Sequence, residues 1–210
     1  MIPVTISTDA AGVLAHEQTI PSRVDRLVAA WRESGIQQTP VMLFGEARWI
    51  VADGHHRLAA ARKLGVRVAA AVVSRPAILP AHRVIHRAPA GWVERMRRAI
   101  PLKKGHGPLA IATASGTDCF DCGGMGAVDQ MRLLWEASDL DGPGVEWSIE
   151  GDRAKALAAI GLGAAAVILV PAIAMEDVVA AAESGVLLPP RSTNFQPKPA
   201  ESSIRFRIGS

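Results

Sequence analysis

The sequence predicts an α/β fold, because helical and strand-like patterns alternate along most of its 210 residues. Hydrophobic residues make up 49% of the chain and charged residues 20%, which suffices for a packed core and excludes a wholly disordered protein. Short apolar runs between helical patterns are typical of buried strands. We divide the chain into residues 1–80 and residues 81–210, although no linker separates them and a single domain also fits the length.

The first half alternates helix and strand in order. The first helix is expected to begin after Ser22, a suitable N-cap, and to end at Gly35. Its inward face has the i, i+3, i+4, i+7 spacing of Val24, Leu27, Val28 and Trp31. The elements expected next are strands at 41–44 and 48–52 around a turn at 45–47, a helix at 55–64 that stops at Gly65, and a strand at 66–73.

The second half has weaker patterns of the same kind. We expect a strand at 109–114, helices at 128–137, 152–160 and 174–183, and a last strand at 204–208. The segment 188–199 is too rich in proline for a helix.

An uncharged run separates Lys155 from Glu176 and has the length of a membrane span. Gly161 and Gly163 interrupt its helical pattern, and residues 164–170 are apolar and rich in β-branched side chains. We therefore interpret the run as a helix, a glycine turn and a buried strand.

The charge pattern narrows the class of protein. The net charge of +3 is too small to indicate nucleic-acid binding by itself, and two cysteines exclude a multi-bridge secreted scaffold. No leader segment is visible, so a cytoplasmic protein is expected. Residues 82–104 carry seven basic side chains against Glu94. We interpret this segment as the solvated side of a helix whose Trp92, Met96 and Ile100 face inward, since aromatic residues for base stacking are few.

The most informative segment is Asp53-Gly54-His55-His56-Arg57, which follows a buried strand and opens a helix. The first amides of a helix lack acceptors and its dipole is positive there, so a phosphate fits such an end. Gly54 allows close backbone approach, Arg57 can hold phosphate oxygens in a fork, and the histidines add donors. Asp53 could hold Mg²⁺ or a substrate amine. The simpler alternative makes Asp53 a helix cap and both histidines surface residues.

Two other segments offer candidate groups. Glu17 could take a proton from a hydroxyl if folding brings it beside the phosphate site, although an isolated acid is more often a solvated or capping residue. Arg191-Ser192-Thr193 follows two prolines as a stiff polar hook that could bind a carboxylate or phosphate, or could be an ordinary loop. Cys119 and Cys122 form a single C-x-x-C, for which zinc binding with His82 and His86, a redox pair, or ordinary cysteines are the alternatives; we favour the last.

Taken together, four segments resemble one known group. The segments 16–19, 51–57, 78–84 and 188–193 occur in the order found in the free serine kinases of the ParB/sulfiredoxin superfamily and in a related bacterial family with the Asp-Gly-His-His-Arg motif. The resemblance implies a ParB/sulfiredoxin-like mixed-sheet domain with a C-terminal α/β extension that completes the site.

The same resemblance implies a function and a set of residues. Glu17 would be the catalytic base and Asp53 a second catalytic residue, in a kinase that uses ATP or ADP with Mg²⁺ and phosphorylates free serine or a similar small hydroxy amino acid. It places nucleotide phosphates on Gly54, His55, His56 and Arg57, and substrate near Thr19, His82, Arg83, Arg191, Ser192 and Thr193. The residues make this sensible, because a carboxylate base helps a weak hydroxyl nucleophile and phosphoryl transfer depends on electrostatic positioning.

The sequence leaves a second class of function open. No Walker A loop or protein-kinase motif set is present, so those kinase architectures are not supported. A non-catalytic nucleotide-sensing or DNA-associated regulator could use the same phosphate loop to switch a partner surface. Such a regulator would show salt-dependent DNA binding.

Overall fold

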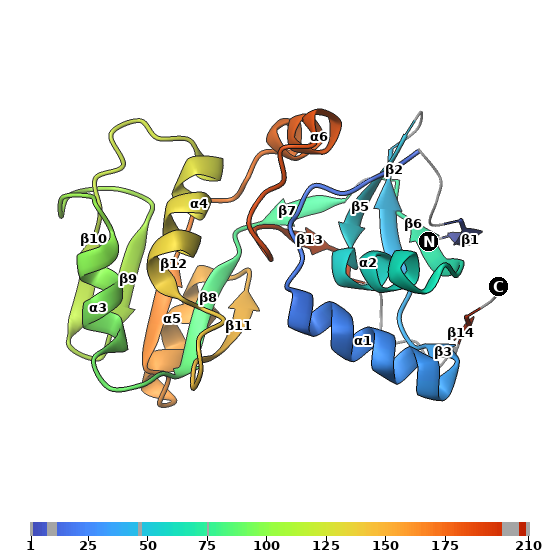
Figure 1. The fold of residues 1–210 in the computed structure, drawn as a ribbon. Helices are drawn as coiled ribbons and strands as arrows, with labels where there is room; N and C mark the ends of the chain where they lie inside the picture. The colour runs from blue at the N-terminus through green and yellow to red at the C-terminus, as the bar shows by residue number, and fades with distance from the viewer. Residues whose placement is uncertain (1, 8–11, 46–47, 75, 199–205, 209–210) are drawn as a thin grey trace. The chain divides into compact units, whose positions relative to one another are not determined.

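The computed structural model describes residues 2–7, 12–45, 48–74, 76–198 and 206–208. The chain forms two compact units (Figure 1). The first contains Met1–Ala77, Glu176–Pro190 and Phe195–Ser210, and the second contains Ile78–Met175 and Arg191–Asn194. Six helices and several sheets are present in the described residues, so the α/β prediction is confirmed.

The first unit is built on a mixed five-stranded sheet with the order β1-β6-β4-β5-β2. These strands are Ile2–Ile6, Val68–Val72, Val41–Phe44, Trp49–Asp53 and Val13–Leu14. β4 pairs parallel to β6 and antiparallel to β5, while β2 runs parallel to β5. The first unit also contains a two-stranded antiparallel pair of β3 (Ile36–Gln37) with β14 (Phe206–Arg207).

Two helices carry the core of this unit. α1 (Pro21–Ser34) and α2 (His55–Leu64) contact each other and pack on the sheet. The predicted inward face of α1 is confirmed, since Val24, Val28 and Trp31 are buried in one cluster with the sheet. Burial of these side chains stabilises the unit at about 25 cal/mol per Å² of apolar surface removed from water.

The ends of α1 were predicted with unequal success. Gly35 has the left-handed conformation, with φ of 64°, and its amide bonds to the Trp31 carbonyl oxygen as expected. The prediction of Ser22 as N-cap is wrong, because the helix already begins at Pro21 and its N-cap is Ile20. Proline suits this first helical position, where its fixed φ is helical and its missing N–H costs no bond.

The remaining expected elements are largely present. α2 ends at Leu64, before Gly65, and α6 (Met175–Ser184) ends before Gly185, both glycines having positive φ. Residues 46–47 of the expected turn and residues 204–205 of the expected last strand lie outside the described residues. β7 (Ala77–Leu79) and β13 (Asn194–Gln196) lie where the chain passes from one unit to the other.

The second unit contains an antiparallel sheet with the order β10-β9-β12-β8-β11. These strands are Gly116–Cys119, Ala110–Thr113, Ala166–Leu169, His82–Arg87 and Glu146–Glu150. The helices of this unit are α3 (Trp92–Ala99), α4 (Ala127–Ser138) and α5 (Arg153–Gly161).

The uncharged run of the sequence belongs to this unit. α5 ends at Gly161, and the fully buried β12 lies at the centre of the sheet. The prediction of helix, glycine turn and buried strand is therefore confirmed. Within the described part of the chain, no helix has both the length and the apolar character that crossing a membrane requires.

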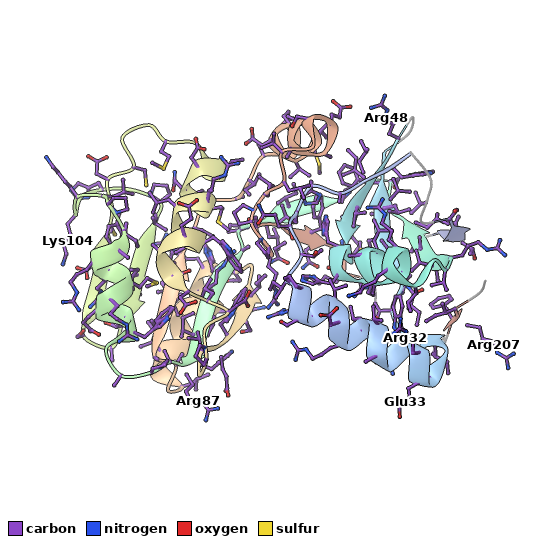
Figure 2. The ribbon with its side chains drawn as sticks, in the orientation of Figure 1. Arg32, Glu33, Arg48, Arg87, Lys104 and Arg207 are labelled. Atoms are coloured by element: carbon purple, nitrogen blue, oxygen red, sulfur yellow. The ribbon has the colours of Figure 1, made fainter. Side chains whose placement is uncertain are left out.

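The basic segment forms an amphipathic helix. Trp92 and Met96 of α3 are buried, as predicted, while Arg95 and Arg98 are exposed. Part of the positive charge of the segment is neutralised, because Arg97 and Lys104 lie 2.9 and 2.5 Å from the carboxylate of Asp118. Figure 2 labels Lys104 and Arg87 on the second unit, and Arg87 pairs with Glu146.

Candidate functional site

The Asp-Gly-His-His-Arg segment makes the junction between β5 and α2. β5 ends at Asp53, α2 begins at His55, and Gly54 is the N-cap with φ of 103° and no side-chain cap. The Leu58 amide donates to the Gly54 carbonyl oxygen, which closes the first helical turn. The three amides before it have no acceptor within the helix. Because the first turn of α2 contains no acidic residue, its positive end is left to attract an anion.

The Arg57 guanidinium lies over the Gly54 backbone. A Cβ atom at position 54 would lie 2.9 Å from Nη2 of Arg57 and 3.1 Å from its Nε. Nη2 donates to the carboxylate of Asp53 at 2.7 Å and to the carbonyl oxygen of Pro40 at 3.2 Å. The buried Nε has no hydrogen-bond partner among the described residues. Glycine is therefore required here by both its φ and the space that the guanidinium occupies.

His56 links the starts of the two helices. Its Nε2 accepts a hydrogen bond from the amide of Ile20, the N-cap of α1, at 3.0 Å. Nε2 is therefore unprotonated, and the neutral ring carries its proton on Nδ1. The first turn of α1 contains no acidic residue either. The positive N-terminal ends of α1 and α2 are thus joined through the His56 imidazole. Two such ends at one place attract a phosphate more strongly than one.

A pocket of about 410 Å³ opens beside this junction. It is lined by Arg23, Arg26, Leu27 and His56. The two arginines were not among the candidate residues of the sequence analysis. A signal for them exists, since they lie about one helical turn apart in the first two turns of α1, where basic side chains oppose the helix dipole. An anion bound in the pocket would interact favourably with both arginines.

Glu17 is buried close to the same junction. The residue is 7% exposed, and its carboxyl group lies between two imidazoles, with Oε1 3.8 Å from Nε2 of His16 and Oε2 3.9 Å from Nδ1 of His55. Glu17 and the first residue of α2 are thus neighbours, although 38 positions separate Glu17 from His55. The first two candidate segments are therefore brought together within one unit.

The start of the segment 188–193 pairs with the backbone beside Glu17. The Gln18 amide donates to the carbonyl oxygen of Leu188 at 2.8 Å, and the Leu188 amide donates to the carbonyl oxygen of His16 at 2.7 Å. Glu17 and Leu188 form an isolated parallel bridge. These bonds hold the segment of Glu17 in an extended conformation and explain how a short connection positions an acid without a helix or a strand of its own.

Both imidazoles beside Glu17 are neutral at physiological pH. Burial lowers the pKa of His16 to about 3, an effect that its hydrogen bond with the Val51 backbone only partly offsets. Burial also lowers the pKa of His55 well below its usual value, and repulsion from the Arg57 guanidinium, and from His16 and His56 in their protonated forms, acts in the same direction. Nδ1 of His16 and Nε2 of His55 lie 3.3 Å apart, and the two rings meet edge to face.

Other predicted substrate residues gather within the second unit. Arg83 is 1% exposed and donates to the carbonyl oxygens of Ala81 and Arg191. The Arg191 guanidinium lies over the Trp147 ring at 4.4 Å from its centre, a cation–π contact. His82 accepts a hydrogen bond from the Val170 amide on Nδ1, and burial is the main cause of its lowered pKa.

Ser192 and Thr193 belong to the second unit and are buried, at 3% and 9% exposure. The segment is thus an ordered part of the fold and not a solvated loop. Thr19 is half-buried in the first unit, one residue before the N-cap of α1. Substrate-binding roles for Thr19, Ser192 and Thr193 stay predictions, as do those for His82, Arg83 and Arg191.

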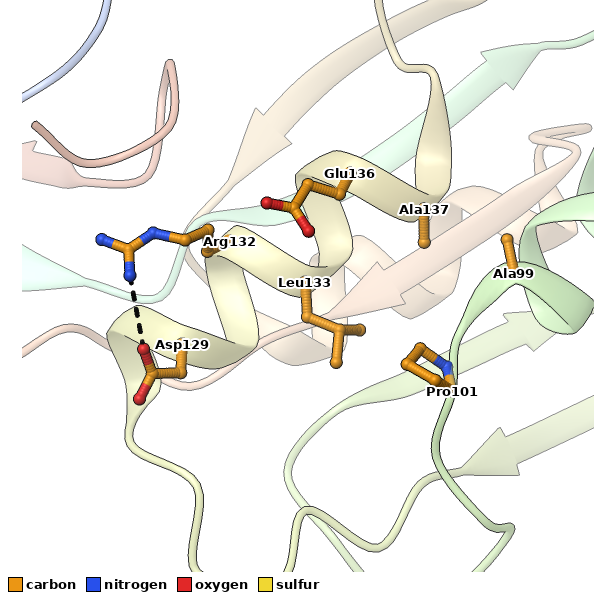
Figure 3. Close-up of a pocket in the computed structure, with 7 residues that line it drawn as sticks. All are labelled: Ala99, Pro101, Asp129, Arg132, Leu133, Glu136 and Ala137. Carbon is orange, nitrogen blue, oxygen red and sulfur yellow. Dashed lines mark ion pairs between the residues drawn. The ribbon is translucent and has the colours of Figure 1, made fainter.

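Among the described ranges, no group of three or more His, Cys, Asp and Glu side chains is arranged so that it could hold a metal ion. Cys119 is half-buried, Cys122 is buried, and both are free thiols. A second hollow, of about 360 Å³, lies in the second unit beside the Asp129–Arg132 ion pair of α4 (Figure 3). It contains none of the candidate residues.

Comparison with known proteins gives one short sequence match and several solved structures of similar fold. No family model matches the chain. An ATP-dependent L-serine kinase from Staphylothermus marinus is 34% identical over 74 residues, which are 34% of this chain and 29% of that kinase. The chain therefore matches less than a third of the length of this curated relative.

Solved structures resemble the chain over nearly its whole length. A free serine kinase in complex with AMP aligns over 99% of this chain and 91% of its own, with 18% identity and a TM-score of 0.72. A conserved hypothetical protein from Pyrococcus furiosus covers 100% and 96%, with 17% identity and a TM-score of 0.76. C-terminally truncated SbnI from Staphylococcus aureus covers 99% and 87%, with 12% identity and a TM-score of 0.73. At these identities the likeness establishes a shared fold.

Proposed function

We propose that the protein is a nucleotide-dependent phosphotransferase that phosphorylates the hydroxyl group of free serine or of a similar small hydroxy amino acid. The observation that carries the proposal is the placement of a buried carboxylate, Glu17, beside the positive start of α2. The fold is shared with free serine kinases that bind AMP and ADP, which supports the same class of reaction.

The nucleotide phosphates are proposed to lie on the start of α2. The amides of His55, His56 and Arg57 would donate to phosphate oxygens, and Gly54 would allow close backbone approach. The guanidinium of Arg57 offers its unpartnered Nε to the same anion. The basic pocket of Arg23 and Arg26 adds positive potential beside it.

Asp53 is proposed to act through Arg57. Its carboxylate holds the guanidinium over Gly54 at 2.7 Å, which fixes the direction in which the remaining N–H groups point. This bond uses one oxygen of the carboxylate, Oδ2. Mg²⁺ enters the proposal as the counter-ion of the nucleotide phosphates, and no step is derived through it.

Glu17 is proposed as the general base. In the reaction the serine Oγ–H proton passes to the Glu17 carboxylate while Oγ forms a bond to phosphorus, and the bond from phosphorus to the leaving nucleotide oxygen breaks. ATP would leave as ADP, and ADP would leave as AMP. Such a base contributes about 10²- to 10⁴-fold in rate. The burial of Glu17 excludes water that would compete with serine for the phosphoryl group.

The experiment is incubation with serine, Mg²⁺ and either ATP or ADP, followed by mass spectrometry for O-phosphoserine and for the released nucleotide. We expect one donor to give product, and we expect Glu17→Gln and Asp53→Asn to abolish turnover while the protein stays folded. Glu33→Gln is the matched control, because Glu33 is an exposed acid at the far end of α1 (Figure 2). Full activity in both site variants would overturn the assignment.

The alternative function, a DNA-associated regulator, is tested by measuring DNA binding. A DNA-associated protein would bind duplex DNA at low salt and lose affinity steeply as salt rises. We expect no such binding, because acids already neutralise part of the basic segment. The substrate roles of Thr19, His82, Arg83, Arg191, Ser192 and Thr193 are tested by the KM for serine in single alanine variants.

A further inference from the structure

Trp147 lies on β11 at a position that faces Arg83 of the neighbouring strand. β11 pairs antiparallel with β8, and Arg83 lies opposite Ile149, two residues beyond Trp147. Residues two apart on one strand share a face of the sheet, so Trp147 and Arg83 are diagonal neighbours on the same face. The Arg83 guanidinium accordingly lies over the Trp147 ring, 5.7 Å from its centre. Strand pairing therefore places an aromatic ring beside a buried arginine.

The indole of Trp147 is held in one orientation. Its Nε1–H donates to the carbonyl oxygen of Leu140 at 3.0 Å, and the side chain is half-buried. Because this bond fixes the edge of the ring and the pairing with β8 fixes its backbone, the ring face has a fixed direction. A cation is attracted to the face of an aromatic ring, and indole attracts it most strongly.

The Arg191 guanidinium also contacts this ring. Its Cζ lies over the ring at 4.4 Å from the centre, closer than that of Arg83. Nη2 of Arg83 in turn donates to the Arg191 carbonyl oxygen at 2.9 Å. Arg191 is therefore held at two points, its guanidinium by Trp147 and its carbonyl group by Arg83. Both holding residues belong to adjacent strands of one sheet of the second unit.

The backbone of Arg191 has a conformation that needs such support. Its φ is 57°, in the left-handed region, where the Cβ atom of an L-residue is crowded by its own backbone. Non-glycine residues keep such a conformation where surrounding contacts over-determine it, and these places cluster at functional sites. The left-handed turn also redirects the chain, so it decides in which direction Ser192 and Thr193 continue.

Ser192 and Thr193 lie between two attachments within the second unit. After Met175, this unit contains the segment Arg191–Asn194. Arg83 and Trp147 hold the first residue of the segment. Nδ2 of Asn194, the last residue, donates to the carbonyl oxygen of Pro80 at 3.4 Å. Weakening the hold on Arg191 would therefore displace the two buried hydroxyl residues that follow it.

We propose that Trp147 is a positioning residue for the amino-acid substrate, because its ring holds the Arg191 guanidinium and so maintains the left-handed turn before Ser192 and Thr193. The inference rests on the proposed function, in which Arg191, Ser192 and Thr193 bind serine. Trp147 acts through Arg191. Its loss therefore weakens serine binding and leaves both nucleotide binding and the transfer step unchanged.

The first test needs no activity. An aromatic ring shifts the proton resonances of groups over its face to lower frequency. In the ligand-free protein we expect the Nε–H and δ-methylene protons of Arg191 to be shifted in this way relative to those of the exposed Arg98. The shift should disappear in Trp147→Leu. Equal shifts for Arg191 and Arg98 would overturn the proposal whether or not the protein is a kinase.

The second test separates positioning from packing by steady-state kinetics. We expect Trp147→Leu to raise the KM for serine about 5- to 30-fold, as for a half-buried cation–π contact. Both kcat and the KM for the nucleotide should stay within about twofold. Trp147→Phe loses the N–H bond to Leu140 but keeps an aromatic face, so it should recover most of the KM for serine. The same KM for serine in the Phe and Leu variants would refute a role of the ring face.

A double variant shows whether Trp147 acts through Arg191. Arg191→Met removes the charge and keeps a long, flexible side chain. In this background we expect Trp147→Leu to change the KM for serine by less than about twofold, since effects that pass through one contact do not add. Effects of the two substitutions that multiply independently would overturn the proposal.

Trp135→Leu is the matched control, because Trp135 is also half-buried in the second unit but lies on α4. We expect its KM for serine to equal that of the wild type. An equal rise in Trp135→Leu and Trp147→Leu would show that lost packing explains the effect, which would refute the proposal. If the wild-type protein forms no phosphoserine, the proposed function fails, and the Arg191 resonances still decide whether the ring holds this residue. If Trp147→Leu does not fold, the wild-type resonances decide in the same way.

Discussion

Replacing Gly54 by alanine adds one methyl group at the junction between β5 and α2. The φ of 103° is one that L-residues rarely adopt, and such strain costs about 1–3 kcal/mol. For a chain of this length each kcal/mol lowers Tm by about 2–4 °C, so the expected fall is about 2–12 °C. The new methyl group would also lie 2.9 Å from Nη2 of Arg57. The guanidinium must therefore move, which weakens its bond to Asp53.

The loss of the Arg57 position has a separate effect on ligand binding. A hydrogen bond to a charged group contributes about 1.5–3 kcal/mol, which corresponds to about a 10- to 100-fold loss of nucleotide affinity. Gly65→Ala is the matched control. Gly65 ends the same helix with φ of 67°, and a Cβ there would meet nothing within 4 Å. This variant should lose stability and keep nucleotide affinity.

The assays are thermal unfolding for stability and calorimetric titration of ADP and AMP for affinity. The reasoning predicts that both glycine variants melt earlier and that only Gly54→Ala binds weakly. Equal affinities in wild type and Gly54→Ala would refute the claim that the backbone at this junction holds the phosphates. Weak binding by Gly65→Ala would show that loss of stability, and not the site, explains the effect.

Three further predictions follow from other contacts. Arg26→Ala should weaken nucleotide binding measured by calorimetry, whereas Arg32→Ala, at the far end of α1 (Figure 2), should not. Equal losses of nucleotide affinity in the two variants would mean that the pocket beside His56 does not hold the anion. Trp31→Ala should lower the free energy of unfolding by about 3–5 kcal/mol in urea titrations, because the side chain is 6% exposed in the core of the first unit; a loss below about 1 kcal/mol would contradict this packing. Burial lowers the pKa of His16 to about 3, so the stability contributed by its neutral form is present above pH 6.5 and is lost as the pH falls toward 3. Urea titrations should therefore show that the free energy of unfolding falls less between pH 7 and pH 4.5 in His16→Asn than in wild type.

Local patterns predicted much of the fold, and α1 shows both their strength and their limit. The 3.6-residue spacing of Val24, Val28 and Trp31 predicts the buried face, because periodicity reports which side of a helix is apolar. The start of the helix was misplaced by the choice of Ser22. The Ile20 amide is bound by His56, 36 residues away, and no local pattern reports such a partner.

The sequence by itself determined the order of the elements and the placement of Asp53-Gly54-His55-His56-Arg57 at the junction of a strand and a helix. Both depend on neighbours within a few positions, where propensity and turn chemistry act. Only the tertiary structure decided that Glu17 lies between His16 and His55, that Arg23 and Arg26 line the adjoining pocket, and that Leu188 pairs beside the acid. These contacts form when distant segments are buried together, and the same burial lowers the pKa of both imidazoles.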